Sequence, residues 1–548
     1  MSFLGLVRRE MHGSLPRLVF MSGLGGISNA ALLAAINAGA QAANNNNKPS
    51  LWAAGLFVVA LLLFIKTQNY ILITATVEIE SIIHKLRVRL LDGVRHSELV
   101  PMEGIGRARI VAAITSDTTV LTQASNMLVF SIQSVILIVF VGFYVAYLSL
   151  VAFLLSMTIV GAMAAIFYFK GRQLAEGQRE AAEWTNRLFD RLTDVLDGFK
   201  EVRLNKLRSD ELFADVVEVS STAAYVKIKA NADNFKRMIF SQFAMYLLLG
   251  AVVFVSPTLS GSGGGTAVTK AILALLFVVG ASFGLVQSIP MLASANAASD
   301  RIEQLEADLL ATAQSADISA AQLPSRFEKI EMHNVLFRYF DRSAEATFKV
   351  GPVNFTLRRG EVVFITGGNG SGKSTFLKVL AGLYVPESGE ILLDGMRVDD
   401  STREMYRSLL TAIFADYHLF MKLYGISSPD PAEVDRLLTE FRLIAKTRLT
   451  DHEFRTLDLS GGQRKRLALV VALLEKRPIL LLDEWTSDQD PDFRRKFYQE
   501  LIPALNQAGA TIVAISHDDR YLNEIDFPMR RLRMDEGRFA EEVGGTQS

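Results

Sequence analysis

The chain has 548 residues, enough for three or four domains of ordinary size, or for fewer if part of it lies in a membrane. Half of the residues are hydrophobic and 21% are charged, a composition that excludes a disordered chain and leaves too little polar surface for a wholly soluble protein. The 57 Lys and Arg balance the 58 Asp and Glu, so no nucleic-acid partner is expected, and the absence of cysteine excludes disulfides, cysteine nucleophiles and thiolate metal sites.

Long apolar stretches fill the first 300 residues. They cover 18–47, 51–73, 118–169 and 238–291, and a membrane span needs about 20 such residues. The third stretch is long enough for two helices that turn near 147–149, and the fourth divides at the glycine-rich segment 260–265. The sequence therefore predicts an all-α transmembrane domain of six helices over residues 1–299.

Basic residues indicate the orientation of these spans, because loops rich in Lys and Arg stay in the cytoplasm. Arg8, Arg9 and Arg17 precede the first span, and the loops 85–109 and 170–237 are rich in both residue types. Both termini and both long loops are predicted to be cytoplasmic. A cleaved signal peptide is the alternative for residues 1–40, but the apolar run is too long for one and another span follows at once.

The two cytoplasmic loops have apolar residues spaced three and four apart, which predicts helical continuations of the spans. Glycine and proline at 101–109, and more weakly a glycine at 197–199, predict that each loop turns there. These tips are placed to contact a cytoplasmic domain.

Lys66, Gln68 and Asn69 form a polar cluster inside the second predicted span. One interpretation is that Lys66 extends to the lipid headgroups, as long basic side chains do near the ends of spans. The other is that the cluster faces a central cavity and binds polar parts of a cargo. The sequence leaves both open.

From residue 300 the composition changes. A polar, alanine-rich linker is predicted over 300–327, and apolar strands over 362–366, 391–393, 479–482 and 511–515 then alternate with helices. Strands that are apolar throughout and separated by helices are typical of a parallel sheet covered on both faces. Residues 328–548 are therefore predicted to form a soluble α/β domain.

A phosphate-binding loop follows the first of these strands. Residues 367–374 fit the pattern G-x-x-x-x-G-K-[ST] and open a helix, whose N-terminus and backbone N–H groups favour phosphate. Lys373 is predicted to reach the β- and γ-phosphates, and Ser374 to supply a hydroxyl to Mg²⁺. The predicted ATP-binding residues here are Gly367, Asn369, Gly370, Gly372, Lys373, Ser374 and Thr375.

Two adjacent carboxylates end the strand 479–482. In P-loop enzymes the first such acid helps to hold Mg²⁺, and a second acid orients or deprotonates the attacking water. Asp483 is assigned to the metal and Glu484 to the water. Taken alone, the pair would also fit an acidic turn at the surface. The phosphate-binding loop in the same domain favours the catalytic interpretation instead.

Two further segments make the chain resemble the ATP-binding cassette transporters. The sequence Leu-Ser-Gly-Gly-Gln at 459–463 matches their signature motif, and His517 follows the last predicted strand, as their switch histidine does. The resemblance covers the whole chain, since six spans followed by one cassette is the arrangement of an exporter half-transporter. It implies a homodimer with two ATP sites, each completed by the partner's signature motif.

By this resemblance Ser460, Gly461, Gly462 and Gln463 would bind the ATP held by the other subunit, and His517 would contact the γ-phosphate in its own. Tyr339 stands where the family stacks an aromatic ring on adenine, and Asp490 lies in the loop that crosses the dimer interface.

Some residues depart from the family pattern. Ala415 stands where the family usually has a glutamine that ligates Mg²⁺ or water, so either Asp416 substitutes for it or the contact is absent. Trp485 is a bulky residue after the catalytic acid. These departures, with the sequences at 483–491 and 516–519, resemble the bacterial cyclic-peptide and siderophore-peptide exporters.

The resemblance implies ATP-driven export of a peptide-like cargo, a cyclic or modified peptide such as a siderophore, across the bacterial inner membrane. A lipid or hydrophobic-drug flippase of the same fold is one alternative, and an ATP-gated membrane ATPase that does not pump is another. The sequence identifies neither the cargo nor an outer-membrane partner.

Overall fold

The computed structural model describes residues 3–10, 15–44, 51–255, 258, 265–311, 327–339, 348–426 and 428–540. The chain forms two compact units. A membrane unit comprises Met1–Arg95 and Ile105–Ala311, and a cassette unit comprises His96–Gly104 and Thr312–Ser548. The short segment 96–104 thus belongs to the cassette unit, although it lies between two membrane helices in the sequence.

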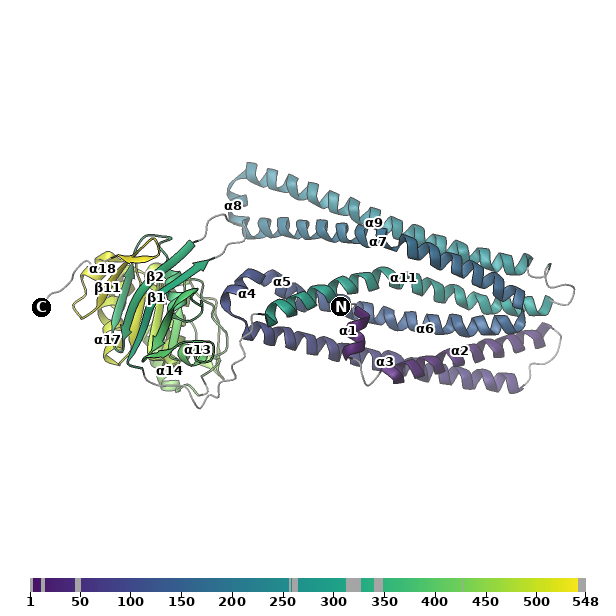
Figure 1. Cartoon of the computed structure of the whole chain (residues 1–548), viewed down its shortest axis with the longest axis horizontal. Helices are drawn as coiled ribbons and strands as arrows, with labels where there is room; N and C mark the ends of the chain where they lie inside the picture. The colour runs from purple at the N-terminus through teal and green to yellow at the C-terminus, as the bar shows by residue number, and fades with distance from the viewer. Residues whose placement is uncertain are drawn as a thin grey trace. The chain divides into compact units, whose positions relative to one another are not determined.

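The membrane unit is entirely helical in its described part. After the short α1 (Phe3–Glu10), each predicted span falls in one long helix, and the six run alongside one another (Figure 1). They are α2 (Leu15–Asn44), α3 (Leu51–His96), α6 (Thr118–Leu148), α7 (Leu150–Asp197), α9 (Lys206–Phe254) and α11 (Gly265–Leu310). Short pieces join them: α5 (Arg107–Ala112), a π-helical turn (Ala113–Asp117) and α8 (Phe199–Leu204).

Length and hydropathy identify membrane-crossing helices within the described residues. Five segments are long and apolar enough: Pro16–Ile36, Leu51–His96, Arg107–Leu148, Lys206–Phe254 and Lys270–Leu310. The apolar start of α7, Leu150–Met163, is shorter. The chain is therefore a multi-pass membrane protein.

Packing within the membrane unit joins one pair of helices that are distant in sequence and one pair that α8 connects. Helix α6 lies along α11, and α7 along α9. The predicted turn at 147–149 is present, where Ser149 is extended and its hydroxyl accepts a hydrogen bond from the Ala152 N–H at 3.3 Å, which caps α7. The predicted turn at 197–199 is present too, since α7 ends at Asp197 and α8 begins at Phe199. Of the predicted break at 260–265, only Gly265 is described, and α11 begins there.

The predicted linker needs a correction. Residues 300–310 are not irregular but continue α11, and their apolar side chains Ile302, Leu305 and Leu309 are buried. These positions are spaced three and four apart, so the charges between them occupy the solvent face of a helix. The rest of the predicted linker, residues 312–326, lies outside the described residues.

The cassette unit contains a six-stranded sheet in the order β12-β11-β3-β10-β9-β6. Strands β6 (Leu410–Ile413), β9 (Ile479–Asp483), β10 (Thr511–Ile515), β3 (Val362–Thr366) and β11 (Arg530–Asp535) are parallel, and β12 (Arg538–Ala540) is antiparallel to β11. Side chains alternate between two hydrophobic cores, with Phe364 and Ile512 in one and Ile365 and Val513 in the other. The parallel sheet covered on both faces is therefore confirmed.

A second, antiparallel sheet has the order β2-β1-β4-β5. Its strands are β1 (Lys329–Tyr339), β2 (Phe348–Arg358), β4 (Ser388–Leu393) and β5 (Met396–Arg397), and a small hairpin is formed by β7 (Leu449–Thr450) and β8 (Glu453–Phe454). Placing 391–393 in the parallel sheet was wrong. Those residues pair with β1 in antiparallel register, which the apolar composition of three residues could not reveal.

Helices of the cassette unit surround the parallel sheet. They are α12 (Lys373–Leu380), α13 (Arg403–Arg407), α14 (Pro431–Glu440), α15 (Gly461–Leu474), α16 (Pro491–Lys496), α17 (Ile502–Gln507) and α18 (Asp519–Asn523), with α4 (Leu99–Ile105) beginning in the segment 96–104. Short 3-10 and π-helical turns occupy Trp485–Asp488 and Phe497–Leu501.

Candidate functional site

The loop between β3 and α12 takes a conformation that glycine alone permits. Gly367 has φ 146°, and a Cβ there would stand 2.1 Å from the backbone oxygen of Met534. Gly372, the N-cap of α12, has φ 101°, and its Cβ would meet a methyl of Val350 at 2.9 Å. The glycines of the motif thus allow a tight loop that presents backbone N–H groups.

This loop surrounds a cavity of about 340 Å³, here called the P-loop cavity. Its lining residues are Phe348, Asn369, Gly370, Gly372, Lys373, Ser374, Thr375 and Glu484. The Lys373 ammonium donates to the carbonyl oxygens of Gly367 at 3.0 Å and Gly368 at 2.8 Å, and burial lowers its pKa. A buried cation beside free backbone N–H groups is suited to the phosphates of a nucleotide.

Ser374 and Asp483 meet at the base of this cavity. The Ser374 hydroxyl donates to the Asp483 carboxylate at 3.1 Å. Burial raises the pKa of Asp483, and the negative charge of Glu484 raises it further. No cluster of three or more His, Cys, Asp or Glu suited to a metal occurs among the described residues. One hydroxyl and one carboxylate still fit Mg²⁺, which commonly takes its other oxygens from water and phosphate.

Glu484 and His517 come together although 33 residues separate them. The His517 Nε2 and the Glu484 Oε1 are 2.9 Å apart, since β9 and β10 are neighbours and both residues follow their carboxyl ends. Glu484 has φ 47° and ψ 38°, a left-handed conformation that is strained for a residue with a side chain. The turn after β9 therefore directs this carboxylate into the P-loop cavity.

Two buried residues, Lys465 and Trp485, hold the strained turn; Trp485 was noted in the sequence only for its bulk, and Lys465 was missed. The Lys465 ammonium, on α15, donates to the Glu484 carbonyl at 2.9 Å and to the Ser487 hydroxyl at 2.6 Å. The Trp485 indole N–H donates in return to the Lys465 carbonyl at 2.9 Å, and its ring stacks on Phe497. The bulky residue after the catalytic acid is thus a fixed link between α15 and Glu484.

The signature residues lie at the N-terminus of α15. Ser460 and Gln463 form a capping box, with the Gln463 side-chain oxygen accepting from the Ser460 N–H at 3.1 Å. Gly462 approaches the backbone so closely that a Cβ would stand 2.5 Å from the Asp488 oxygen. Ser460 and Gly461 are exposed and do not line the P-loop cavity of their own chain.

The aromatic ring that lines the P-loop cavity is Phe348, which the sequence interpretation missed. Tyr339, the predicted adenine platform, is its partner in the β1–β2 register and is half-exposed beside it. Strand pairing across eight intervening residues could not be inferred from spacing.

Asp490 makes contacts within its own chain. It caps α16 by accepting from the Phe493 N–H at 2.9 Å, and it accepts from the Arg466 guanidinium at 2.7 Å. At the position of the missing glutamine, Ala415 offers only a methyl side chain, and the negative charge of the neighbouring Asp416 adds to the effect of burial in raising the Asp483 pKa.

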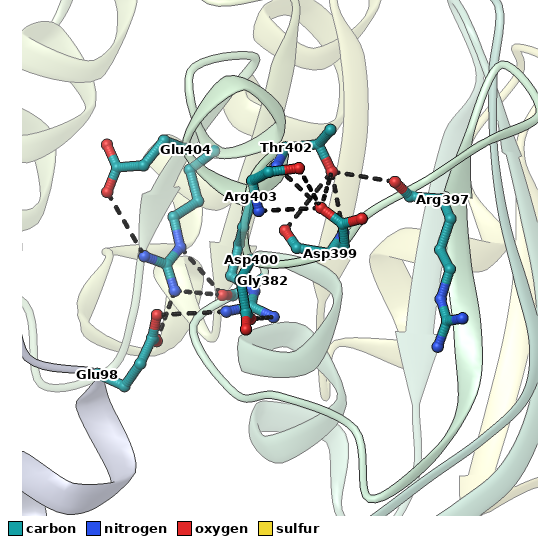
Figure 2. Close-up of polar contacts among 10 residues, drawn as sticks. Glu98, Gly382, Arg397, Asp399, Asp400, Thr402, Arg403 and Glu404 are labelled. Atoms are coloured by element: carbon teal, nitrogen blue, oxygen red, sulfur yellow. Dashed lines mark hydrogen bonds and ion pairs between the residues drawn. The ribbon is translucent and has the colours of Figure 1, made fainter. Parts of the chain in front are cut away.

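The segment 96–104 is attached to the rest of the cassette unit by two glutamates, of which Figure 2 shows Glu98. Glu98 accepts from Arg407 at 2.6 Å and lies 3.5 Å from the buried Arg403. Glu103 accepts from the Tyr384 hydroxyl at 2.9 Å and from Lys378 at 3.4 Å. Burial, and then the Glu103 carboxylate, raise the Tyr384 pKa.

Arg403 and Arg407, which pair with Glu98, lie on α13, and a turn at 399–402 precedes that helix. The Asp399 carboxylate accepts from the N–H groups of Ser401 at 2.9 Å and Thr402 at 3.2 Å, immediately before α13. Arg403 then pairs with Asp400 at 2.8 Å as well as with Glu98.

Together the membrane unit and the P-loop cavity define a membrane-embedded ATPase. The family description ABC transporter matches residues 350–487. The ATP-binding protein SyrD of Pseudomonas syringae pv. syringae is 32% identical, with 98% of this chain and 96% of that protein covered. This chain therefore belongs to the ATP-binding cassette transporters, as a half-transporter of the exporter type that couples ATP hydrolysis to transport.

Two further relatives are similar over different extents. The probable syringafactin export ATP-binding/permease protein SyfD of Pseudomonas syringae pv. syringae is 32% identical over 34% of this chain and 30% of its own length. A solved bacterial Atm1-family ABC exporter with ATP bound superposes with a TM-score of 0.72 at 22% identity, covering 98% of this chain and 95% of that one. The latter likeness shows the fold.

Proposed function

We propose that the protein is a homodimeric, Mg²⁺-dependent exporter of a cyclic or otherwise modified peptide across the bacterial inner membrane, with both termini in the cytoplasm. The exposure of Ser460 and Gly461 outside the P-loop cavity of their own chain carries the proposal of a homodimer. A helix N-terminus with exposed N–H groups binds anions. The ATP held by a second copy of the chain would supply the phosphate for the N-terminus of α15.

At each composite site the residues of one chain have separate tasks. Lys373 and the loop N–H groups hold the phosphates, and Ser374 and Asp483 would hold Mg²⁺, which neutralises phosphate charge when bound. Glu484 orients and deprotonates the attacking water, and His517, 2.9 Å from that carboxylate, fixes its direction and reaches the γ-phosphate. Tyr339 supports the adenine beside Phe348.

Coupling to transport passes through the loop tips. Glu98 and Glu103 attach the segment 96–104 to Arg403, Arg407 and Tyr384, so movement of the cassette pulls on α3 and α5. The second tip, 197–203, belongs to the membrane unit and exposes Phe199. ATP favours the closed dimer because it binds that state more tightly.

The proposal of a peptide-like cargo rests on the relatives, since SyfD is named for the export of syringafactin. ATP turnover of the full chain in nanodiscs, measured with cyclic peptides and separately with added lipids, tests this. We expect peptides to raise turnover by several-fold and lipids to leave it unchanged. Stimulation by lipids alone would instead indicate a flippase, and cargo movement down a gradient without hydrolysis would indicate a gated ATPase.

A further inference from the structure

A cavity of about 200 Å³ lies among four helices of the membrane unit, α2, α3, α6 and α11. Its polar lining comes from Ser22 and Asn29 on α2, Gln68 on α3, and Gln133 and Ser134 on α6. None of the described residues that line it is Lys, Arg, His, Asp or Glu. We call this cavity the amide-lined pocket.

The two glutamines form a reciprocal pair across α3 and α6. The Gln68 amide donates to the Gln133 oxygen at 3.2 Å, and the Gln133 amide donates back at 3.3 Å. Each side-chain amide has two N–H donors and two acceptor lone pairs, so this pair uses half of the capacity of each. The remaining donors and acceptors are available to a molecule in the pocket.

The other polar groups of the pocket are also available. Within the described ranges, the side chains of Ser22, Asn29 and Ser134 have no hydrogen-bond partner in the protein. Ser28 and Thr67, which do not line the pocket, instead donate to backbone oxygens of their own helices at 2.8 and 2.9 Å. Unpaired polar groups are unfavourable in an apolar environment, so a ligand or water that satisfies them is stabilised.

Size and charge define what fits. A cavity of about 150 Å³ can hold a benzene-sized molecule, so the amide-lined pocket holds a group about as large as one amino-acid side chain with its amide. An ionised group would enter without a counter-charge, which is costly in a membrane interior. Phe64 and Phe130 add an apolar wall for the hydrocarbon part of the ligand.

We propose that the amide-lined pocket binds one uncharged, amide-bearing residue of the cargo, with Gln68 and Gln133 as the residues that select it. The proposal rests on the proposed peptide export and narrows it to a cargo with a neutral carboxamide at the point of recognition. Charged counterparts of the same shape are rejected, because none of the described lining residues compensates their charge.

The structure also divides the polar cluster seen in the sequence. Gln68 lines the pocket, whereas Lys66 and Asn69 are exposed on another face of α3 and do not. The three residues therefore do not act as one group, and only Gln68 belongs to this site.

A purely structural role for the glutamine pair is the competing explanation, because polar pairs also join membrane helices. The double variant Gln68→Leu/Gln133→Leu distinguishes this structural role from ligand binding. Replacing both partners by apolar groups of similar shape keeps the helix contact, so the fold is retained, but it removes the ligand-binding amides. Thr67→Val is the matched control, since Thr67 neighbours Gln68 and bonds only its own helix.

The chain has no cysteine, so Ser134→Cys places a single thiol in the pocket. The rate of its reaction with N-ethylmaleimide is measured on the full chain in nanodiscs, with N-acetylglutamine methylamide or its glutamate counterpart as the probe. We expect the glutamine probe to slow labelling at least about threefold and the glutamate probe to have no effect. In the double leucine background this protection disappears, whereas in the Thr67→Val background it remains.

Equal protection by both probes, absence of protection, or protection that survives the double variant would each overturn the proposal. The double variant is accepted as folded if its gel-filtration profile and its thermal unfolding midpoint match those of the parent. Cyclic peptides that differ by one Gln or Glu are then compared for ATPase stimulation. If labelling behaves as expected but no peptide stimulates ATP hydrolysis, the proposed ligand of the pocket is supported and the proposed peptide export is contradicted. If peptides stimulate hydrolysis but the glutamine probe does not slow labelling, only the proposal for the pocket is contradicted.

Discussion

The P-loop cavity and the amide-lined pocket are constructed in opposite ways. All residues that line the first, apart from Phe348 and Glu484, come from 369–375, and it contains a buried ammonium and a carboxylate. The second draws its lining residues from four helices between Ser22 and Ala281 and contains no charged side chain among the described residues. A phosphate site needs a continuous run of backbone N–H groups, whereas a neutral side-chain site needs only scattered amides brought together by packing.

The largest effect expected on the charged site is that of Glu484→Gln. The amide keeps the shape and can still hydrogen-bond His517, but it cannot accept the proton of the water, so ATP hydrolysis should fall by roughly two orders of magnitude or more. ATP binding should be retained, as measured with a fluorescent nucleotide. Near-normal turnover in nanodiscs would show that another group is the base.

The homodimer predicts a characteristic result when subunits are mixed. Lys373→Ala weakens nucleotide binding, and Ser460→Ala weakens the contribution made to the partner's nucleotide. A heterodimer of the two variants retains at most one intact composite site, so its hydrolysis should not exceed about half that of the parent. Full ATPase activity from a chain that is monomeric at micromolar concentration would contradict the two-site arrangement.

Trp485→Phe sharpens the account of how Glu484 is held. Phenylalanine keeps the stacking on Phe497 but removes the N–H that donates to the buried Lys465 carbonyl, a loss of about 0.5–1.5 kcal/mol for one hydrogen bond. We expect kcat to fall about threefold to tenfold with KM for ATP unchanged, because the turn loosens while the phosphate loop does not. A rise in KM with constant kcat would mean that Trp485 serves nucleotide binding instead.

Glu98→Gln tests the attachment of the segment 96–104, with Glu404→Gln as its control. Glu98 faces Arg403 and Arg407 at the attachment, whereas Glu404 is exposed and lies 3.9 Å from Arg407. We expect peptide-stimulated hydrolysis to fall about threefold and basal hydrolysis to stay within twofold, since loss of a charge-assisted hydrogen bond weakens coupling without touching the P-loop cavity. Equal behaviour of the two variants would remove Glu98 from the coupling path.

The two regions also differ in what their sequence reveals. The roles of Lys373, Ser374 and Asp483 could be assigned from the sequence. The order of the motifs and the ends of the parallel strands place these residues together independently of the loop conformations. Lys465 and Phe348 were missed because their roles depend on tertiary packing onto Glu484 and Gly372. In the membrane unit hydropathy predicts the helices, but not that Gln68 faces Gln133 while Lys66 turns away, since rotation of a span is set by its neighbours.

The smallest expected effect concerns two neighbouring glycines of α2. A Cβ on Gly26 would stand 2.5 Å from the Ile136 Cγ2 and 3.2 Å from the Phe140 ring, whereas a Cβ on Gly25 comes no closer than 3.4 Å to the Thr67 hydroxyl. The branched Ile136 side chain cannot rotate away cheaply, so Gly26→Ala should push α2 from α6 at a cost of about 1–3 kcal/mol. Gly25→Ala adds ordinary contact and should be nearly neutral. Thermal unfolding in detergent compares them, with Gly26→Ala expected to unfold several degrees lower; equal midpoints would mean that α2 and α6 are not held this closely, and with them one wall of the amide-lined pocket.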